Sequence, residues 1–353
     1  MKIGICGYYG VNNLGDEAIL EALKYALGNK YPGAEIVVFG KGMQFPVGVR
    51  TLVTSLFKPI LWKKPLNALK TCDLFVVGGG GLFSDEEGIF IPVYWSLQGL
   101  IALLFSKKVI CLGISIGRLN MINRLITKFF LKRTKLITVR DESSFLKLKE
   151  WGVKSHNLSD LTFLLPYYKP KLETGKKYVV LSLRKFKNFT PSLYKIIAQA
   201  CDKIVSNYGL DIKLLPFQTG QQNDEEVLNK IFDLSKNKNK ICILNVEHKN
   251  IFSIIDILAN AEVVIGMRLH SCILSSIAKT PFIPLSYMQK VDNFWKKEQL
   301  FTPIQIGSIT SEILFNRLDK VLKDLSNYKQ IAGSICVSNR LKVSKLLDML
   351  DNL

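Results

Sequence analysis

The most chemically suggestive stretch of this chain is the glycine-rich loop Gly7–Ala18, with the sequence Gly-Tyr-Tyr-Gly-Val-Asn-Asn-Leu-Gly-Asp-Glu-Ala. Its glycines permit positive φ angles and bring bare backbone amides close to a ligand. Asp16 follows the last glycine, so a carboxylate lies beside these amides. A helix cap needs only one acid, whereas this loop is longer than a usual strand-to-helix connection. The loop therefore predicts a site for a polar ligand that carries hydroxyls, with Gly10, Asn13 and Gly15 as candidate contacts.

The spacing of this loop differs from that of the two common phosphate-binding loops. It fits neither the dinucleotide fingerprint nor the P-loop, because Asp16-Glu17 stands where a P-loop has Lys followed by Ser or Thr. A carboxylate at this place repels phosphate, but it accepts hydrogen bonds from sugar hydroxyls or removes a proton from one. Asp16 is therefore a candidate catalytic residue on an acceptor side, with a simple helix cap as the structural alternative.

A second strong signal is Gly266-Met267-Arg268-Leu269-His270-Ser271, which lies between an apolar strand pattern and a helical pattern. Arg268 offers a planar fork for a carboxylate or phosphate, and His270 exchanges a proton near neutral pH. The amides at the start of the helix add donors for an anion. This turn predicts an anion site with Arg268 and His270 as candidate catalytic residues and Ser271 as a substrate contact.

Further candidates follow other predicted strands. Arg140 and Arg184 each come after an apolar run, where each can clamp an anion or form a salt bridge. Four glycines, 78–81, follow the run 73–77 and bring bare backbone to a strand end near Asp85. These patterns add Asp85 as a catalytic candidate and, as substrate contacts, Arg140, Arg184, Gly79, Gly80 and Gly81.

One competing motif is Gly113-Ile114-Ser115-Ile116-Gly117, which matches the nucleophile elbow of serine hydrolases. Leu112, Ile114 and Ile116 instead indicate that a buried strand continues through the motif. With His270 as a triad histidine, a hydrolase stays open as an alternative.

The composition is that of an ordinary globular protein. The chain has 353 residues, 48% of them hydrophobic and 22% charged, which suffices for two domains and argues against disorder. Its seven cysteines and three histidines lack the spacing of a disulfide framework or a zinc site. The first residues form a strand pattern with no room for a signal peptide, and polar residues interrupt the most apolar stretch, 89–117. We therefore expect a cytoplasmic protein without a metal site.

The net charge of +19 indicates an anionic partner. The candidates are nucleic acid, an anionic membrane face and an acidic substrate. Lysines are spread along the chain without the aromatics of a single-strand platform, so we expect no nucleic-acid partner. The segment 122–135 is a basic amphipathic pattern, with Arg124, Lys128 and Lys132 on one face and Ile122, Ile126, Phe129 and Phe130 on the other. We expect the apolar face to pack on the core, and peripheral contact with an anionic membrane is the alternative.

Short apolar runs alternate with helical patterns along the whole chain, which predicts an α/β protein of two doubly wound, Rossmann-like domains that face each other across a cleft. In the first half, strands are expected at 2–6, 35–40, 73–78, 108–114 and 135–139, and helices at 16–29, 59–70, 90–105, 119–133 and 142–151. In the second half, strands are expected at 178–184, 211–216, 241–245, 263–266, 282–286 and 303–306, and helices at 191–207, 223–235, 250–260, 270–278, 290–299, 310–327 and 337–351. The domains that follow are 1–165 on the acceptor side, a linker at 166–177, 178–330 on the donor side, and a terminal helix in 331–353 that packs back on the first domain.

Together, these segments resemble the polysaccharide pyruvyl transferase family. The resemblance spans nearly the whole chain and rests on the opening glycine loop and on the segments 78–85, 139–143 and 266–271. Ser159-Asp160 and 286–294 are also similar to family segments, although Met288 stands where the family usually has Asp. Lys290 in the last of these segments is a further candidate substrate contact.

The resemblance implies a fold similar to the two-domain GT-B glycosyltransferases. It also implies transfer of a pyruvyl group from phosphoenolpyruvate onto two sugar hydroxyls of a surface-polysaccharide precursor, as a cyclic ketal, with release of phosphate. Phosphoenolpyruvate is then the donor substrate and no cofactor is needed, while the acceptor is expected to be a lipid-diphosphate-linked oligosaccharide at the inner membrane face. A basic protein suits these anionic partners.

Each candidate residue has a role in this implied chemistry. Cationic side chains hold the two charged groups of the donor, namely Arg268, Arg140, Arg184 and Lys290. His270 supplies the proton that the alkene carbon gains, and Asp16 or Asp85 orients or deprotonates the acceptor. Two other function classes stay open: a nucleotide-sugar glycosyltransferase of similar fold, and a non-enzymatic binder of anionic polymers.

Overall fold

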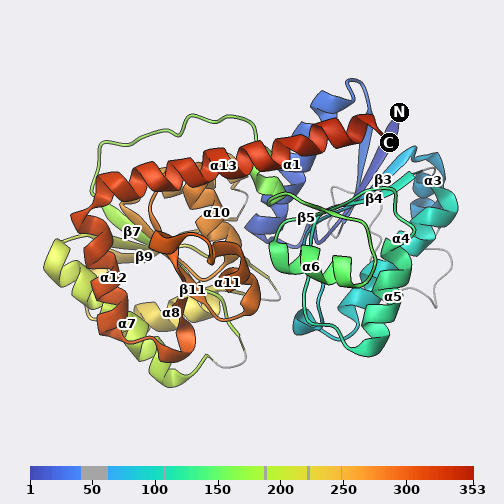
Figure 1. Cartoon of the computed structure of the whole chain (residues 1–353). Coiled ribbons are helices and arrows are strands. Elements are labelled where there is room, and N and C mark those ends of the chain that lie inside the picture. Colours follow the sequence, from blue (N-terminus) through green and yellow to red (C-terminus); the bar gives the residue numbers. More distant parts are fainter. Residues whose placement is uncertain (41–62, 107, 187–188, 221–222, 248) are drawn as a thin grey trace. The chain divides into compact units, whose positions relative to one another are not determined.

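Buried apolar runs form two separate parallel sheets in the computed structural model, which describes residues 1–40, 63–106, 108–186, 189–220, 223–247 and 249–353 (Figure 1). The chain divides into two units of contacting residues. Unit 1 consists of Met1–Val11, Asp16–Pro166 and Asn339–Leu353. Unit 2 consists of Asn12–Gly15 and Tyr167–Ser338, so a short piece of the first loop belongs to the second unit.

The sheet of unit 1 has the strand order β2-β1-β3-β4-β5-β6, with all neighbours parallel. Its central strands are almost entirely buried, as expected for a parallel sheet with helices on both faces. The strands are β1 (Lys2–Cys6), β2 (Glu35–Phe39), β3 (Leu74–Phe83), β4 (Lys108–Ile116), β5 (Ile137–Val139) and β6 (His156–Asn157). The helices are α1 (Leu14–Lys30), α3 (Lys63–Thr71), η2 (Asp85–Glu87), α4 (Ile91–Phe105), α5 (Met121–Leu131), α6 (Glu142–Glu150) and η3 (Leu161–Leu164).

The sheet of unit 2 has the order β12-β11-β10-β7-β8-β9 and is also parallel. Its strands are β7 (Tyr178–Ser182), β8 (Asp211–Leu214), β9 (Ile241–Ile243), β10 (Val263–Gly266), β11 (Phe282–Ser286) and β12 (Ile304–Gln305). Its helices are α7 (Pro191–Tyr208), α8 (Glu225–Leu234), η4 (Lys238–Lys240), α9 (Ile251–Ala259), α10 (Leu269–Ile277), α11 (Gln289–Trp295), η5 (Gln299–Phe301), η6 (Ile306–Ser308) and α12 (Ser311–Lys323). Residues 166–177, all of them described, form neither helix nor strand.

The last helix, α13 (Leu325–Asp351), contributes its end, from Asn339 on, to unit 1. There the Tyr31 hydroxyl donates to the carbonyl of Leu350 over 3.1 Å, and Lys30 pairs with Asp351. Two helices were predicted here, at 310–327 and 337–351, and two are observed, but the predicted position of the break is wrong. It lies at Asp324, so α12 ends earlier and α13 begins earlier than predicted. A backbone at φ −128° and ψ 39° ends α12 at Asp324.

The predicted fold class, two doubly wound Rossmann-like domains of the GT-B type, is confirmed by the two six-stranded parallel sheets. Most predicted elements agree with the observed ones within a few residues, although the start of the helix at 59–70 lies outside the described residues. One prediction about the glycines is wrong. Strand β3 does not end before Gly78 but runs through all four glycines to Phe83, with an irregular register after Gly80.

Strand order shows where a ligand can bind in each sheet. In unit 1 the order reverses between β1 and β3, and in unit 2 between β7 and β10. Ligands of open α/β sheets bind at the carboxyl ends of the strands at such reversals. The residues after β7 and β10 include Arg184 and Arg268, and the glycine loop follows β1.

Helix α5 is oriented differently from the sequence-based expectation. Ile122 and Phe129 were expected to pack on the core but are 68% and 50% exposed, whereas Phe130 is buried. The core side of the helix carries instead two polar residues, Asn123 and Thr127, each at most 3% exposed. Among the described residues, each helix is too short or too polar to cross a bilayer.

Close packing of α4 on α5 depends on a glycine. A Cβ at Gly99 would lie 2.1 Å from the ring of Phe130, which is itself fully buried. Gly99→Ala should therefore lower the free energy of unfolding by about 1–3 kcal/mol, because the interior cannot yield to extra volume. Urea unfolding followed by circular dichroism measures this change.

Gly28→Ala in α1 is the matched control, because no described atom lies within 4 Å of its Cβ. In a helix interior this change should stabilise by up to about 1 kcal/mol. Equal effects of the two substitutions would contradict the packing described for Gly99.

Candidate functional site in unit 2

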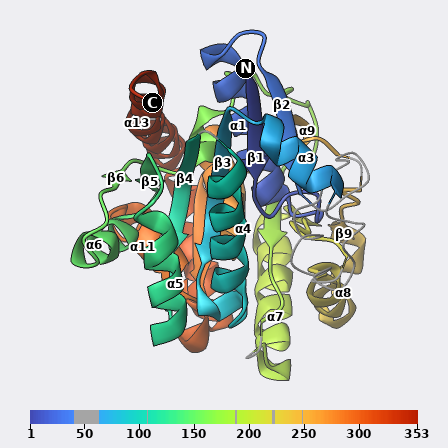
Figure 2. The same ribbon diagram turned by 90° about the vertical axis from the view of Figure 1, so that its right-hand side faces the viewer.

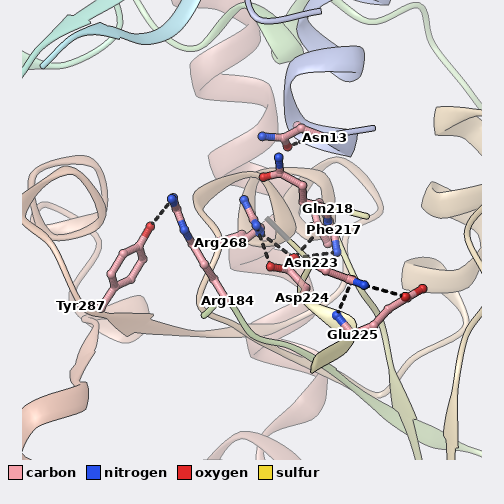
Figure 3. Close-up of polar contacts among 10 residues, drawn as sticks. Asn13, Arg184, Phe217, Gln218, Asn223, Asp224, Glu225, Arg268 and Tyr287 are labelled. Atoms are coloured by element: carbon pink, nitrogen blue, oxygen red, sulfur yellow. Dashed lines mark hydrogen bonds and ion pairs between the residues drawn. The ribbon is translucent and has the colours of Figure 1, made fainter. Parts of the chain in front are cut away.

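Two arginines leave adjacent strand ends at the reversal of the unit 2 sheet. Ser182 at the end of β7 pairs with Gly266 at the end of β10, and the amide of Met267 donates to the carbonyl of Ser182 over 2.9 Å. Arg184 and Arg268 each lie two residues beyond this pair, and Figure 3 shows Arg184 extending toward Tyr287 and Arg268 contacting Asp224. The topology thus brings together two cations that lie 84 positions apart in the sequence.

Arg268 forms a buried two-point ion pair that the sequence analysis did not foresee. Its Nε donates to Asp224 Oδ2 over 2.7 Å and its Nη2 donates to Asp224 Oδ1 over 2.6 Å (Figure 3). The arginine side chain is 8% exposed and that of the aspartate 1%. The edge of the guanidinium that the sequence analysis assigned to a ligand is therefore occupied by Asp224. Only Nη1 lies outside this pair.

Asp224 also holds the neighbouring turn. Its Oδ2 accepts hydrogen bonds from the amides of Phe217 and Gln218, over 3.1 and 3.0 Å. Burial raises the pKa of this carboxyl above its ordinary value, and the pair with Arg268 opposes that shift. Sequence reasoning missed Asp224 because an acid at the start of the predicted helix 223–235 is ordinary, and only the strand order places it beside Arg268.

Arg184 contacts a tyrosine. Its Nη1 donates to the hydroxyl of Tyr287 over 2.8 Å, and its Cζ lies 5.6 Å from the centre of the tyrosine ring. A phenol accepts this bond without neutralising the guanidinium, so the contact orients the charge. Tyr287 follows β11, the next strand after β10, and half-buried Lys290 lies in the first turn of α11.

The piece of the glycine loop that belongs to unit 2 is attached to the turn that Asp224 holds. The amide of Leu14 donates to the carbonyl of Phe217 over 2.8 Å, and Asn13 forms an antiparallel bridge with Gln218. Figure 3 shows Asn13 next to Gln218. The Oδ1 of Asn13 accepts from the amide of Gly15 over 3.1 Å, which fixes the start of α1.

Gly15 lies directly against His270. A Cβ at Gly15 would be only 2.3 Å from Nδ1 of the imidazole and 2.9 Å from its Cβ. The imidazole is half-buried in the first turn of α10, with its Nε2 shielded from solvent. The two strongest signals of the sequence, the glycine loop and the His270 turn, are therefore in contact.

Gly266 and Ser271 have structural roles in the same turn. The Ser271 hydroxyl is fully buried and donates to the carbonyl of Arg268 over 2.6 Å. A Cβ at Gly266 would lie 2.2 Å from that hydroxyl oxygen. Ser271 therefore closes the start of α10 on the strand end, and its predicted role as a substrate contact stays a prediction.

In unit 1, buried Tyr9 explains part of the glycine pattern. Its hydroxyl donates to the carbonyl of Gly78 over 2.7 Å, and burial raises the pKa of this phenol well above its ordinary value. A Cβ at Gly7 would lie 2.4 Å from the tyrosine ring. Gly10 has a φ of 71°, and its amide donates to Glu17 Oε1 over 2.7 Å.

The glycines of β3 are explained by different features of the structure. Gly79 and Gly80 have φ angles of 71° and 89°, and a Cβ at Gly79 would lie 2.2 Å from Ile19. A Cβ at Gly80 would lie 3.4 Å from Asp16 Oδ1, whereas no described atom lies within 4 Å of one at Gly81. Positive φ angles thus account for Gly79 and Gly80, and packing against Ile19 also accounts for Gly79, while the space around Gly81 is open.

The observed contacts give Asp85 a structural role. Its Oδ2 accepts from the amide and the side chain of Asn120 over 2.5 and 3.0 Å, and its Oδ1 accepts from Asn123 Nδ2. These bonds tie η2 to the start of α5. We therefore propose no catalytic role for Asp85.

Arg140 is likewise engaged inside unit 1. Its Nη1 donates to Asp160 Oδ2 over 2.8 Å and its Nε donates to Ser115 Oγ over 2.7 Å, with Arg140 and Asp160 both buried. Ser115 lies within strand β4 and donates onward to Asp141, so the predicted continuation of a buried strand through the serine motif is confirmed. A strand interior lacks the exposed turn of a nucleophile elbow.

Comparison with known proteins identifies the family. A family model described as polysaccharide pyruvyl transferase matches residues 13–289. The chain belongs to this family. The amylovoran biosynthesis protein AmsJ of Erwinia amylovora is 24% identical over 299 residues, which are 76% of this chain and 69% of that protein. Both findings agree with a transferase of polysaccharide synthesis.

Solved structures similar to this pyruvyl transferase show its fold. A putative UDP-N-acetylglucosamine 2-epimerase from Listeria monocytogenes has a TM-score of 0.66 and 11% identity, covering 94% of this chain and 90% of the other. The S. aureus MnaA–UDP co-structure also has a TM-score of 0.66, with 12% identity and coverage of 96% and 92%. In the described part of this family member, no three His, Cys, Asp or Glu side chains cluster as metal ligands would.

The buried pair between Arg268 and Asp224 predicts a large stability effect in this pyruvyl transferase. Asp224→Asn still offers an oxygen to the amides of the turn, but it leaves the guanidinium buried without its countercharge. We expect a loss of about 3–5 kcal/mol in the free energy of unfolding. Chemical denaturation measures this loss.

Lys230→Ala, in the helix that follows Asp224, is the matched control because it removes an exposed lysine, which pairs with Glu226 and lies over the ring of Tyr194. The denaturation midpoint of that variant should equal that of the wild type. An Asp224→Asn protein as stable as the control would contradict the importance of the buried pair.

The carboxyl of Glu17 predicts a pH effect. Burial raises its pKa above the ordinary 4.5, and the bond from Gly10 opposes the rise. The folded state therefore binds the proton more tightly than the unfolded state, so this group lowers stability as the pH rises from 4.5 through the raised pKa. Glu17→Gln keeps an acceptor for Gly10 without titrating, and its stability relative to the wild type should rise over that range.

Urea unfolding of both proteins from pH 4.5 to neutral pH measures this relative stability. A difference that stays constant over this range, or falls, would contradict a raised pKa of Glu17 in the folded protein.

Proposed function

We propose that this transferase moves a pyruvyl group from phosphoenolpyruvate onto two hydroxyls of a sugar in a surface-polysaccharide precursor. The product is a cyclic ketal, and phosphate leaves. The observation that supports this proposal best is the contact of Gly15 with His270, at the sheet reversal that also carries Arg184 and Arg268. A small donor with a carboxylate and a phosphate suits this site, which offers a proton donor, two cations and the positive end of a helix.

The cations hold the donor in this proposal. Arg184, oriented by Tyr287, contacts one anionic group. Arg268 contributes through Nη1, since Asp224 fixes the orientation of its guanidinium. The amides at the start of α10 and Lys290 add donors near the ends of β10 and β11. Positioned positive charge of this kind stabilises negative charge that moves onto the phosphate as it leaves.

His270 supplies the proton in the first step. The methylene carbon of the donor gains this proton and becomes a methyl group, while the first sugar hydroxyl adds to the neighbouring carbon and returns its proton to the imidazole. The second hydroxyl then replaces the phosphate, so one carbon–oxygen bond breaks and a second bond to the sugar forms. The last hydroxyl proton leaves with the phosphate. We keep Asp16, next to Gly15 in the chain, as the group that orients the acceptor.

The test is a reaction of the purified protein with phosphoenolpyruvate and a panel of lipid-linked and nitrophenyl hexosides. Phosphate release and a mass increase of the sugar report the transfer. We expect His270→Ala to lower kcat/KM by about 10²–10⁴-fold. Gly15→Ala should cost about 10²-fold, because the new methyl group displaces the imidazole.

Gly307→Ala is the control in the same unit, because no described atom lies within 4 Å of its Cβ. Its activity should equal that of the wild type. Full activity of folded His270→Ala would overturn the assignment of the acid. A melting temperature that rises with nucleotide sugars and not with phosphoenolpyruvate would favour a glycosyltransferase instead.

A further inference from the structure

The amphipathic helix α5 turns its apolar side chains outward. Met121, Ile122, Leu125 and Phe129 are between 50% and 77% exposed. Met121, Leu125 and Phe129 recur every four residues and so form a stripe along one face of the helix. Scattered single apolar residues on a surface are normal, but an unbroken exposed stripe indicates a contact surface.

Polar residues on the opposite side of α5 fix its rotation. Asn123 Nδ2 donates to Asp85 and, over 2.7 Å, to the carbonyl of Ile89. Thr127 shares a hydrogen bond of 3.3 Å with Ser96 of α4, and both side chains are fully buried. Turning the apolar stripe inward would break these buried hydrogen bonds, which are costly to lose. The exposure of the stripe is therefore specified by the fold of unit 1.

The neighbouring helix extends this apolar surface. Helix α4 contains no charged residue, and its contact with α5 leaves Leu97 and Leu104 exposed, the latter by 77%. Ile89 and Phe90, just before α4, are exposed next to the start of α5, where the carbonyl of Ile89 accepts from Asn123. Figure 2 shows α4 and α5 side by side on the face turned to the viewer. We call the exposed apolar residues of these segments the α4–α5 face.

The stretch of sequence that forms this face is rich in positive charge. Between Glu87 and Asp141 the sequence has no acidic residue. The same stretch carries many cations: Lys107, Lys108, Arg118, Arg124, Lys128, Lys132, Arg133, Lys135 and Arg140. On α5, Arg124 and Lys128 recur every four residues beside the apolar stripe and Lys132 continues the row, while the guanidinium of Arg133 lies 3.4 Å from the centre of the Phe129 ring. Of these, Arg124 also pairs with Glu150 in an exposed contact.

We propose that the α4–α5 face docks on the surface of an anionic phospholipid bilayer. Its apolar side chains enter the boundary between headgroups and acyl chains, and the flanking cations contact the phosphates. A helix with an apolar side and a Lys/Arg-rich side has this character, and its binding combines buried apolar area with attraction to anionic lipid. Each lysine or arginine near such a surface contributes about fivefold to binding.

The charge pattern favours lipid over a second copy of the chain. A symmetric dimer through this face would pair the same patch with itself and so bring the rows of cations together. Like charges opposed across an interface are unfavourable. An anionic bilayer removes this repulsion and accepts the apolar stripe as well. The proposal concerns binding alone and does not depend on the proposed reaction.

Co-sedimentation of the full chain with vesicles tests the proposal. The vesicles consist of phosphatidylcholine alone or of phosphatidylcholine with phosphatidylglycerol. We expect at least about tenfold stronger binding to the anionic vesicles. Ile122→Ser with Phe129→Ser should weaken that binding about tenfold or more. Lys128→Gln with Lys132→Gln should weaken it about 25-fold and reduce its dependence on salt.

Matched controls lie elsewhere on the surface. Leu234→Ser with Leu341→Ser removes apolar side chains that are 46% and 65% exposed, and Lys236→Gln with Lys238→Gln removes two exposed cations. Both control proteins should bind anionic vesicles as the wild type does. Unchanged binding of the Ile122/Phe129 variant, with a melting temperature equal to that of the wild type, would overturn the proposal. A wild-type dimer in light scattering that the same variant converts to monomers would also overturn it, in favour of a second copy.

Discussion

The buried ion pair between Arg268 and Asp224 organises the candidate site of unit 2. Asp224 holds the amides of Phe217 and Gln218, and this turn in turn binds the backbone of Leu14 and Asn13. Through that attachment Gly15 reaches the imidazole of His270. A buried pair of charges gives little net stability compared with an apolar core, but the removal of one partner is costly. We infer that the pair is present because it fixes a turn, a loop and an arginine in one arrangement.

Much of the fold could be predicted from the sequence, because strands that are buried on both faces form nearly continuous apolar runs. The order of the strands could not be predicted, since it depends on which runs pair over long distances. For the same reason the sequence indicated Arg268 and His270, which lie in one turn, but did not reveal Asp224 as the partner of Arg268. The contact of Gly15 with His270 joins residues that are 255 positions apart, and no local pattern records it.

The errors of the sequence analysis also have physical causes. The amphipathic pattern at 122–135 was correct as a pattern, but periodicity does not tell which face of a helix points inward. The buried hydrogen bonds of Asn123 and Thr127 decide this question in favour of an exposed apolar stripe. Likewise, a run of glycines suggests a loop, whereas Gly78 and Gly79 belong to strand β3, where Leu23 and Ile19 fill the space that side chains would need.

The four residues Asn12–Gly15 belong to unit 2, although the chain before and after them belongs to unit 1. Neither unit can therefore be produced whole from one continuous segment of the sequence. A fragment that began at Tyr167 would lack Leu14 and Asn12, whose backbones bond to Phe217 and Thr219. It would also lack Gly15, which lies against the imidazole of His270. The segment Asn12–Gly15 is thus needed for the contact between Gly15 and His270, although Arg184, Arg268 and His270 all lie in the second half of the sequence.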